Sequence, residues 1–528
     1  MKNPIFQSWE GGLYSNAEAG NLDISQSPDT ENMVSGRKQA LKLRKGQVKI
    51  MDKSATSAGK AITMLYNYTK SDGTSSVLVG YDGVVKILDL TDGSTTDLPT
   101  PLSGRSTTAK DGADVYDDVL FFCNGIDSMV KYDGTANSAI TLTNVASATF
   151  KTNSFVFKSR KMFAIDYANP RLLHRSKTDG GTAADIYTFN YTGGSVVENS
   201  GTTSIKEGGT PITALKELDA LYVYTENRVL TADFKDLAGD TVFDTDTIAR
   251  GVGAQSMNGV VSIGNAMVFF DPRDRNLQQL GQQENYPGVQ VNGVTNSIKN
   301  LTQGVYSFDT MDSVYWNNKV LIACKSTVDQ PVNDLVLMLD LETNGIYKIT
   351  GWYVNKWCIV GTSLYYGSSI GPFVYQAFES NSDDGAAING YWTTKIEDFD
   401  APASYKNAQH LYVEGTIDDL QKLEVTVLLD RGRDSITKTI DGSNTAYIQE
   451  QTFIGSLGEE ELGLHNLGGV ANEGERIFYV VLKLNCKKFI TAQVQLKTVG
   501  GVGACGIKKC YFLDPRIDTD KFPSNRII

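Results

Sequence analysis

Residues that could do acid–base or metal chemistry are few and widely separated in this chain of 528 residues. The three histidines, His174, His410 and His465, fall in different expected strands or loops, and none has a cysteine or carboxylate at ligand spacing. Cys505 and Cys510 lack the second pair of cysteine or histidine ligands that a tetrahedral zinc site requires. We therefore interpret the histidines as structural or surface residues and expect neither a metal nor a cofactor.

Pairs of carboxylates are the other candidates for catalysis, because two of them can hydrolyse a glycosidic bond. Such pairs occur in DTDTIA (244–249) and SDD (382–384), and acidic residues also cluster in EEELG (459–463). In a protein of strands and turns they are typical of hairpin tips and solvated loops. The glycine-rich GGVGAC (500–505) lacks the Lys-Ser/Thr of a phosphate-binding loop, which favours a bend between strands. We predict that the protein is not an enzyme.

The charge balance argues against a protein whose main task is to grip nucleic acid. The net charge is −12, from 49 basic and 61 acidic residues, whereas such grip needs clustered lysine and arginine. The balance is compatible with an acidic channel surface that DNA passes without binding, because the negative charges of the protein and of the phosphates repel each other. One basic cluster occurs in GRKQALKLRKG (36–46). Two interpretations are open: the cluster contacts DNA or an acidic partner, or its charges are simply solvated. Its basic residues are Arg37, Lys38, Lys42, Arg44 and Lys45.

Short strands joined by tight turns are the dominant local pattern. After residue 61, apolar runs alternate with Asp72-Gly73, Asp82-Gly83 and Asp92-Gly93. Asp-Gly is a strong hairpin signal because both residues tolerate positive φ. Three such turns imply four antiparallel strands in about 40 residues, which is the size of one β-propeller blade.

Units with the same rhythm recur along the chain. In each, an apolar strand and a polar turn lead to a second strand such as ALYVY (220–224) or AMVFF (266–270), and a third strand follows. A single β-meander cannot bury both of its faces, whereas radial stacking of several meanders does so. The sequence therefore predicts an all-β protein with a β-propeller of about seven blades over residues 61–380.

The two ends of the chain differ from this repeat. Residues 1–60 are polar and poor in alternation, so we expect an extended N-terminal arm. The polar, glycine-rich ESNSDDGAAINGYW (379–392) is typical of a linker, and longer alternating strands such as KLEVTVLLD (422–430) follow it. We predict a C-terminal β-sandwich-like platform domain over 386–515 and a loosely ordered tail over 516–528.

No targeting or membrane segment is expected. The opening MKNPIFQSWEGG lacks the apolar core of a signal peptide, and no run approaches the ~20 apolar residues that span a bilayer. Four of the six cysteines lie in apolar, strand-like contexts, which is typical of buried free thiols rather than a disulfide framework. We expect synthesis in a reducing cytosol and no stable membrane insertion.

Three separate stretches carry a family-level signal. The first combines the opening WEGGLYSN with the later ENMVSG and ALKLRKG. The second combines YWNNKVLIAC with LYYGSSIGPFVYQ. The third is the single stretch YWTTKIEDFDAPASYKNAQHLYVEG. Together they resemble β-propeller proteins of tailed-phage virions, in particular the tail nozzle (tail hub) proteins of short-tailed phages. The positions that match the pattern are Gly11, Gly12, Leu13, Asn32, Arg44, Gly46, Trp392, Lys395 and Lys406.

The resemblance implies a structural, non-enzymatic part of a bacteriophage tail, assembled in the host cytoplasm and located in the virion. It implies a homohexameric ring attached to the portal–adaptor complex, in which the chain ends form a platform and the propellers stand outside a central channel. Such a ring would form and gate the channel for DNA ejection. Its partners would be the adaptor, which is the head-to-tail connector, and tail fibre or tip proteins, with DNA passing non-specifically.

A receptor- or glycan-binding propeller at the virion tail tip is the alternative hypothesis. Propellers bind ligands at the mouth of their central channel, often with exposed aromatic side chains. Trp9, Trp352 and Trp357 are candidates for that role, although burial between strands is the commoner use of tryptophan.

Overall fold

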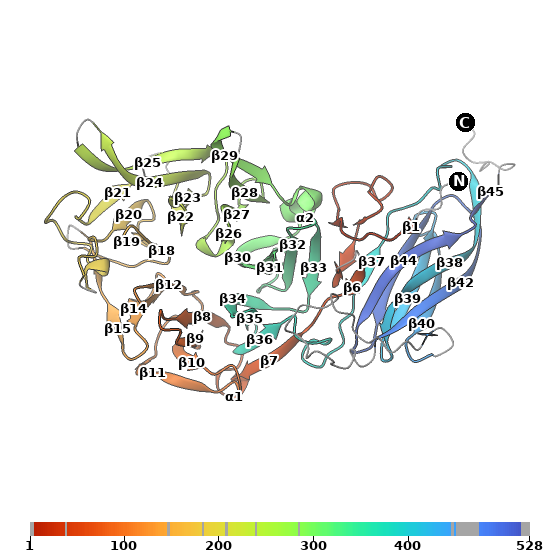
Figure 1. The fold of residues 1–528 in the computed structure, drawn as a ribbon, viewed down its shortest axis with the longest axis horizontal. Helices are drawn as coiled ribbons and strands as arrows, with labels where there is room; N and C mark the ends of the chain where they lie inside the picture. The colour runs from red at the N-terminus through yellow and green to blue at the C-terminus, as the bar shows by residue number, and fades with distance from the viewer. Residues whose placement is uncertain are drawn as a thin grey trace. The chain divides into compact units, whose positions relative to one another are not determined.

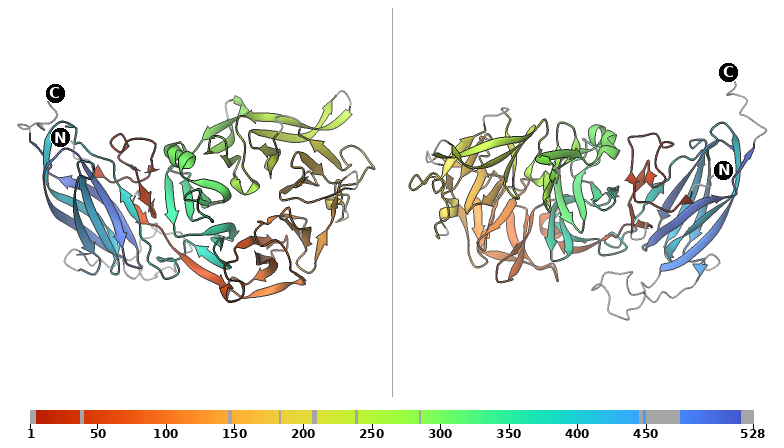
Figure 2. Two further views of the ribbon diagram at one scale, coloured as in Figure 1. Left: turned by 180° about the vertical axis from the view of Figure 1, so that it is seen from behind. Right: turned by 45° about the horizontal axis from the view of Figure 1, so that its top comes forward.

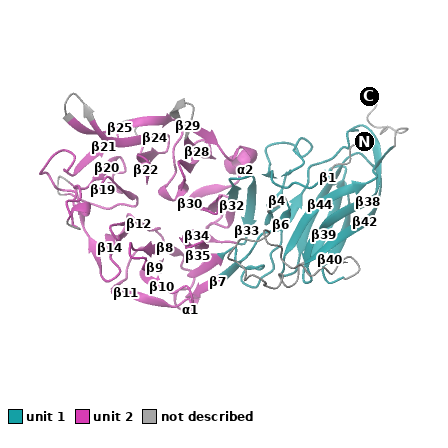
Figure 3. Ribbon diagram, in the orientation of Figure 1, with its two compact units in different colours: residues 1–48, 337–351, 377–528 teal, residues 49–336, 352–376 magenta. Residues whose placement is uncertain are grey.

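The structure is a computed structural model in which the chain divides into two compact units. Unit 1 comprises Met1–Val48, Leu337–Gly351 and Ala377–Ile528, and unit 2 comprises Lys49–Val336 and Trp352–Gln376 (Figure 3). The structure describes residues 5–36, 40–144, 148–181, 184–205, 210–237, 240–283, 286–444, 448–449 and 475–518. Both ends of the described chain belong to unit 1, so unit 2 is an insertion into it.

Seven four-stranded sheets follow one another along the described chain (Figure 1). The first two contain β8 (Ile62–Thr69), β9 (Ser75–Tyr81), β10 (Val84–Leu88) and β11 (Thr95–Leu102), then β12 (Gly112–Tyr116), β13 (Val119–Cys123), β14 (Met129–Tyr132) and β15 (Asn137–Ile140). The third and fourth contain β18 (Phe155–Lys158), β19 (Lys161–Ile165), β20 (Leu172–Arg175) and β21 (Gly201–Ser204), then β22 (Ile212–Glu217), β23 (Leu221–Thr225), β24 (Arg228–Leu237) and β25 (Asp240–Arg250).

The remaining three sheets complete the series. The fifth and sixth contain β26 (Val260–Ile263), β27 (Ala266–Asp271), β28 (Asn276–Gln283) and β29 (Tyr286–Gly293), then β30 (Ser307–Trp316), β31 (Lys319–Lys325), β32 (Leu335–Asp340) and β33 (Ile346–Thr350). The seventh contains β34 (Val354–Val360), β35 (Ser363–Ser368), β36 (Phe373–Ala377) and β7 (Gln47–Asp52).

The first strands of these sheets contact one another in a closed cycle within unit 2. Strand β8 contacts β12, β12 contacts β18, and β18 contacts β22. Strand β22 contacts the 3₁₀ helix η3 (Met257–Gly259), which leads into β26, and from there the contacts run through β30 and β34 back to β8. Figure 2 shows the sheets of unit 2 around a common centre. This is the arrangement of a β-propeller, as the sequence predicted.

The core of unit 2 lies between neighbouring sheets. Val79 of β9 packs in one cluster with Cys358 of β34 and Val374 of β36, which joins the first sheet to the last. On its other face, Leu78 of β9 packs in a cluster with Phe122 of β13, which joins the first sheet to the second. Because successive residues of a strand point to opposite faces, each sheet can bury both of its faces against neighbours.

Strand β7 closes the seventh sheet with residues from near the start of the chain. It lies at the edge of that sheet, next to β36, so segments more than 300 residues apart form one sheet. The predicted arm over 1–60 is therefore corrected: residues 1–48 belong to unit 1, and β7 completes a propeller sheet. The sequence QVKIMD does not show the alternation of buried and exposed residues that identifies a strand, because only its first and fifth residues are buried.

Unit 1 is built around two larger sheets. The eight-stranded sheet contains β41 (Ile448–Gln449), β42 (Glu475–Phe489), β38 (Tyr405–Asp418), β44 (Cys505–Leu513), β6 (Leu41–Leu43), β5 (Met33–Ser35), β1 (Ile5–Phe6) and β45 (Arg516–Asp518). The five-stranded sheet contains β4 (Thr30–Glu31), β37 (Tyr391–Thr393), β43 (Ala492–Val499), β39 (Lys422–Leu429) and β40 (Asp434–Asp441). Alternate residues of β38, β39 and β43 are buried, so each sheet covers its core with one face.

The predicted C-terminal domain over 386–515 is thus present as strands, but it is not made from C-terminal residues alone. Strands β1, β4, β5 and β6 come from the first 43 residues. Of the tail over 516–528, the described part is β45, which pairs with β38; the rest lies outside the described residues.

A few short elements connect these sheets. Two-stranded pairs are formed by β2 (Gly12–Leu13) with β3 (Gln26–Ser27), and by β16 (Leu142–Thr143) with β17 (Thr149–Phe150). The described helices are α1 (Ser54–Ser57), α2 (Lys299–Gly304), η2 (Asp185–Tyr187), η3 and η4 (Asn296–Ile298).

Two Asp-Gly turns of the first sheet allow a matched test of how closely β7 packs against that sheet. Gly73 and Gly93 have φ of 84° and 70°, so alanine strains either turn by about 1 kcal/mol. A Cβ at Gly73 meets nothing within 4 Å, whereas one at Gly93 would lie 2.0 Å from the carbonyl oxygen of Ile50 in β7. We predict that Gly93→Ala lowers the free energy of unfolding by about 2–4 kcal/mol and Gly73→Ala by about 1 kcal/mol. Thermal unfolding of both variants checks this, and equal losses would contradict the close approach of β7.

Candidate functional site

The predicted histidines do not meet in the structure. His174, on β20, is buried with Nδ1 2.9 Å from Thr202 Oγ1 and Nε2 3.6 Å from Asp166 Oδ2. Burial lowers the pKa of His174, although Asp166 opposes this effect. His410 lies on β38 of unit 1, and His465 lies outside the described residues. The described histidines therefore have separate, local surroundings.

The acidic pairs also have local roles. Asp244 and Asp246 lie two residues apart on β25, and both contact Lys235 of β24, with 3.5 Å between Asp244 Oδ2 and Lys235 Nζ. They lie within the ladder of the β24–β25 hairpin rather than at its tip, which corrects that expectation: the strand alternation places both on one side, where one lysine meets them. The cluster over 459–463 lies outside the described residues.

The cysteines and the glycine-rich segment agree with their predicted contexts. All six cysteines are buried and none forms a disulfide in the described chain, and burial raises the pKa of the Cys510 thiol to about 12. Residues 500–504 connect β43 to β44, and Gly500 has φ of 81°. The segment is a bend between strands.

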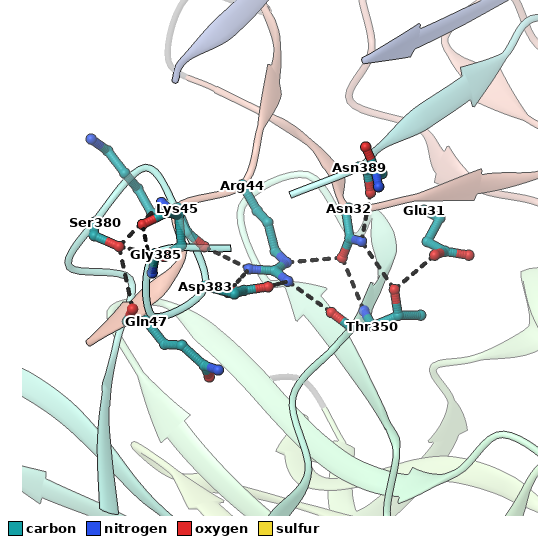
Figure 4. Close-up of polar contacts among 11 residues, drawn as sticks. Glu31, Asn32, Arg44, Lys45, Gln47, Thr350, Ser380, Asp383, Gly385 and Asn389 are labelled. Atoms are coloured by element: carbon teal, nitrogen blue, oxygen red, sulfur yellow. Dashed lines mark hydrogen bonds and ion pairs between the residues drawn. The ribbon is translucent and has the colours of Figure 1, made fainter. Parts of the chain in front are cut away.

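Asp383, from the acidic pair in SDD (382–384), instead belongs to a buried cluster in unit 1 that we call the Arg44 clamp: Arg44, Asn32, Thr350 and Asp383 (Figure 4). The Arg44 side chain is 1% exposed. Its two terminal nitrogens donate to Asp383, at 2.9 Å to Oδ1 and 2.6 Å to Oδ2, and one also donates to the Thr350 carbonyl at 2.7 Å. Nε donates to Asn32 Oδ1 at 2.8 Å. A planar guanidinium suits such a forked carboxylate contact better than an ammonium.

Asn32 and Gly46 fit the clamp for steric reasons. Asn32 has φ of 55°, a region that asparagine tolerates better than most residues, and its amide nitrogen donates to Thr350 Oγ1 and to the Asn389 carbonyl. A Cβ at Gly46 would lie 2.0 Å from the Ser382 carbonyl oxygen. The clamp therefore joins segments near residues 32–46, 350 and 383, all within unit 1.

The basic cluster over 36–46 is divided by this arrangement. Lys42 and Lys45 are exposed, while Arg44 is buried. Arg37 and Lys38 lie outside the described residues. The hypothesis that Arg44 contacts DNA is therefore corrected, because its charge is used inside the fold.

Other positions that carry the family resemblance are also structural. Gly12 has φ of 63°, and a Cβ there would lie 2.5 Å from the Ile346 amide nitrogen. Trp392 is fully buried. Lys406 is buried as well, and its ammonium donates to three backbone carbonyl oxygens. Lys395 forms an ion pair with the carboxylate of Glu397 at 3.3 Å.

A cavity of ≈ 290 Å³ lies within unit 2 where the first strands of several sheets meet. Its charged lining residues are Asp111, Lys216, Asp312 and Lys356. Lys356 Nζ donates to Asn258 Oδ1 at 2.8 Å and lies 3.3 Å from Asp312 Oδ1. We call this the central cavity.

Burial dominates the electrostatics around the central cavity. It lowers the pKa of Lys110, whose Nζ donates to the Thr310 carbonyl at 2.6 Å, to about 8. It also lowers the pKa of Lys216 and raises the pKa of Asp111, even though Arg105 lies 2.5 Å from Asp111. Moving charges out of water is unfavourable unless they are paired, so these groups are held in a strained electrostatic environment.

The sequence identified one residue of this cavity and missed the others. Trp357 lines it, whereas Trp9 and Trp352 are fully buried. The lysines were missed because their positions are far apart in the chain. A single lysine inside an otherwise apolar strand, as in TALKEL around Lys216, is the signal that was available.

The central cavity offers ammonium and N–H donors next to aromatic and apolar walls, which is an arrangement suited to binding. Among the residues that the structure describes, no group of three or more His, Cys, Asp or Glu side chains is placed to hold a metal ion. None of the described helices is long and apolar enough to cross a membrane.

The Arg44 clamp gives a first prediction for this site. We expect Asp383→Asn to lower the free energy of unfolding by about 3 kcal/mol, because it leaves a buried guanidinium without its counter-charge. Asp97→Asn is the matched control: Asp97 pairs with Lys86 at 2.9 Å but is 57% exposed, so the expected loss is below about 1 kcal/mol. Chemical denaturation measures both, and similar small losses would show that the clamp contributes little.

A second prediction concerns pH. The pKa of Lys110 is about 8 in the folded chain and 10.5 without the environment of the fold. Between these values the unfolded chain holds a proton on Lys110 that the folded chain has lost, so the free energy of unfolding rises with pH. Below pH 8 the folded chain must bury the charged ammonium and bears the full cost of doing so. The stability difference between the native protein and Lys110→Met should therefore shift in favour of the native protein as pH rises through this window. Thermal midpoints measure it. Lys86→Met should show no such rise, because the hydrogen bond to Asp97 raises the pKa of Lys86 instead of lowering it.

Comparison with known proteins gives a limited result. No family model and no curated protein sequence matches the chain. Among solved structures, the computationally designed Ika8 protein shares 12% identity over 63% of this chain and 99% of its own, with a TM-score of 0.36. A catalytically inactive virginiamycin B lyase from Staphylococcus aureus shares 10% over 62% and 97% (TM-score 0.39), and YCF48 from Cyanidioschyzon merolae shares 10% over 63% and 98% (TM-score 0.38).

Proposed function

We propose that the protein is a non-enzymatic structural component of a bacteriophage tail, the nozzle ring on the portal–adaptor complex that forms and gates the channel for DNA ejection. In this proposal each four-stranded sheet is one blade of a seven-bladed propeller, and unit 1 is the platform domain. The ring is a homohexamer in the virion, and its partners are the adaptor and tail fibre or tip proteins.

The main support for the proposal is that both ends of the described chain build one β unit. The resemblance implies a platform made by the chain ends, and unit 1 takes strands from residues 5–43 and 391–518. Residues that carry the resemblance, Asn32 and Arg44, lie at the Arg44 clamp inside this unit. Asn32 and Arg44 thus hold together the unit that the proposal assigns to assembly.

A row of apolar side chains on the outer face of the eight-stranded sheet also supports assembly. Ile5 is paired with Tyr511, Tyr511 with Tyr412, and Tyr412 with Val481 across four neighbouring strands. Directly paired residues lie on the same face of a sheet, and Val481 and Ile5 are 54% and 42% exposed. Such an exposed apolar row is typical of a surface that another protein covers. We call it the outer-face row.

Mass photometry of the full chain, alone and with the portal–adaptor complex, tests the proposal. We expect rings of about six copies on the adaptor, because closed homo-oligomers of this kind have fixed copy numbers. A chain that stays monomeric and has no affinity for the adaptor would overturn it.

Charge placed on the outer-face row should prevent assembly. We predict that Val481→Asp reduces ring formation on the adaptor by at least about tenfold, because an aspartate is costly to bury in an interface. Leu420→Asp is the control, since Leu420 is 62% exposed in the same unit but is not part of the row. Equal ring formation by the two variants would exclude the row from the interface.

The alternative, a receptor- or glycan-binding propeller, is favoured by a groove of ≈ 390 Å³ in unit 2. Tyr116 and Tyr187 line it together with Lys131 and Asp179, and Tyr116 Oη donates to Asp179 Oδ2 at 2.9 Å. Aromatic rings beside carboxylates suit sugar rings and their hydroxyl groups. Binding of the isolated protein to host surface glycans, lost in Tyr187→Ala, would support this function instead.

A further inference from the structure

The central cavity contains hydrogen-bond donors without acceptors. Lys216 lines it and is half-buried, and its ammonium has no hydrogen bond or ion pair among the described residues. Trp357 also lines the cavity, is 7% exposed, and its indole Nε1 has no hydrogen-bond partner. Buried donors are nearly always paired with protein or water, so the Trp357 N–H, with Lys216 in the same lining, points to a bound species.

Buried lysines show how this fold normally satisfies an ammonium. Lys161, on β19, is fully buried and donates to three backbone carbonyl oxygens, of Ser176, Glu198 and Asn199. Lys406 in unit 1 has the same arrangement. Lys216 departs from this pattern although burial also disfavours its charge.

The carboxylates near the cavity are already used by other groups. Asp111 is paired with Arg105 at 2.5 Å. Asp312 accepts from the Trp357 backbone nitrogen at 2.8 Å and pairs with Lys356 at 3.3 Å. Asp114 of β12 attracts Lys216 electrostatically but forms no ion pair with it. Among the charged residues that line the cavity, Lys216 is therefore the one without an ion-pair partner in the described chain.

We propose that the central cavity of unit 2 binds a small oxyanion, of the phosphate or carboxylate class, on the ammonium of Lys216, with the Trp357 N–H as a further donor and Lys356 adding positive potential. The cavity of ≈ 290 Å³ is several times the roughly 30 Å³ of a water molecule, so a hydrated oxyanion fits. Charge-assisted hydrogen bonds are the strong ones in such surroundings. The site belongs to unit 2 and does not depend on the proposed tail function.

Calorimetric titration of the full chain with inorganic phosphate, and separately with acetate, tests this site. We expect Lys216→Met to weaken binding by about tenfold or more, and Lys216→Arg, which keeps the charge, to weaken it by less than about threefold. Lys299→Met is the matched control, because Lys299, in α2, pairs with Asp274 and does not line the cavity. Preference for phosphate or for acetate identifies the class of oxyanion. Binding of neither, or equal binding by Lys216→Met and the native protein, would overturn the proposal.

A second measurement does not depend on the folding of a variant. Amine-reactive labelling of the native protein, read by mass spectrometry, follows the accessibility of each lysine. Saturating phosphate or acetate should slow labelling of Lys216 by about fivefold or more and leave Lys299 unchanged. Equal rates at Lys216 with and without both anions would show that the cavity holds only water.

Discussion

The burial of one guanidinium constrains the whole layout of the chain. Arg44 is inside unit 1, and its donors are satisfied by Asn32, Thr350 and Asp383. These residues come from the start of the chain, from the end of the last strand of the sixth sheet, and from the segment after the seventh sheet. Since an unpaired buried charge is strongly unfavourable, unit 1 cannot reach its final packing until the chain has passed through unit 2 and returned. The clamp therefore couples the two ends of an insertion of more than 300 residues.

Local patterns predicted much of the fold, because hairpins are local. The Asp-Gly turns at Gly73, Gly83 and Gly93 each adopt positive φ, and the repeated meanders form four-stranded sheets as expected. The N-terminal strands were not predicted, because β5 and β6 have three residues each and offer too little alternation to recognise. Strand β6 pairs with Gly506 and Ile507 of β44, a partner that only the complete fold brings close.

The candidate sites were predictable only as single residues. Asn32, Arg44 and Gly46 were identified by resemblance, while their partner Asp383 was interpreted as part of a linker. The role of Asp383 follows from the buried Arg44 rather than from its own neighbours in sequence. In the central cavity, Lys216 and Lys356 are 140 positions apart, and closure of the ring brings their strands to one centre. The spacing of residues in the sequence does not predict which strands meet at the centre, because this depends on the number and curvature of the sheets.

Buried cations in both units, including Lys161 of unit 2, have acceptors inside the fold, and the contrast with Lys216 separates structural from binding residues. In unit 1, Arg44 and Lys406 each reach a full set of acceptors within the fold, so they specify one arrangement of the chain. In unit 2, Lys216 is half-buried without such a set, and burial disfavours its charge unless a partner offsets the cost. A lysine that lines a cavity without an acceptor inside the fold is better explained by the binding that we propose than by packing.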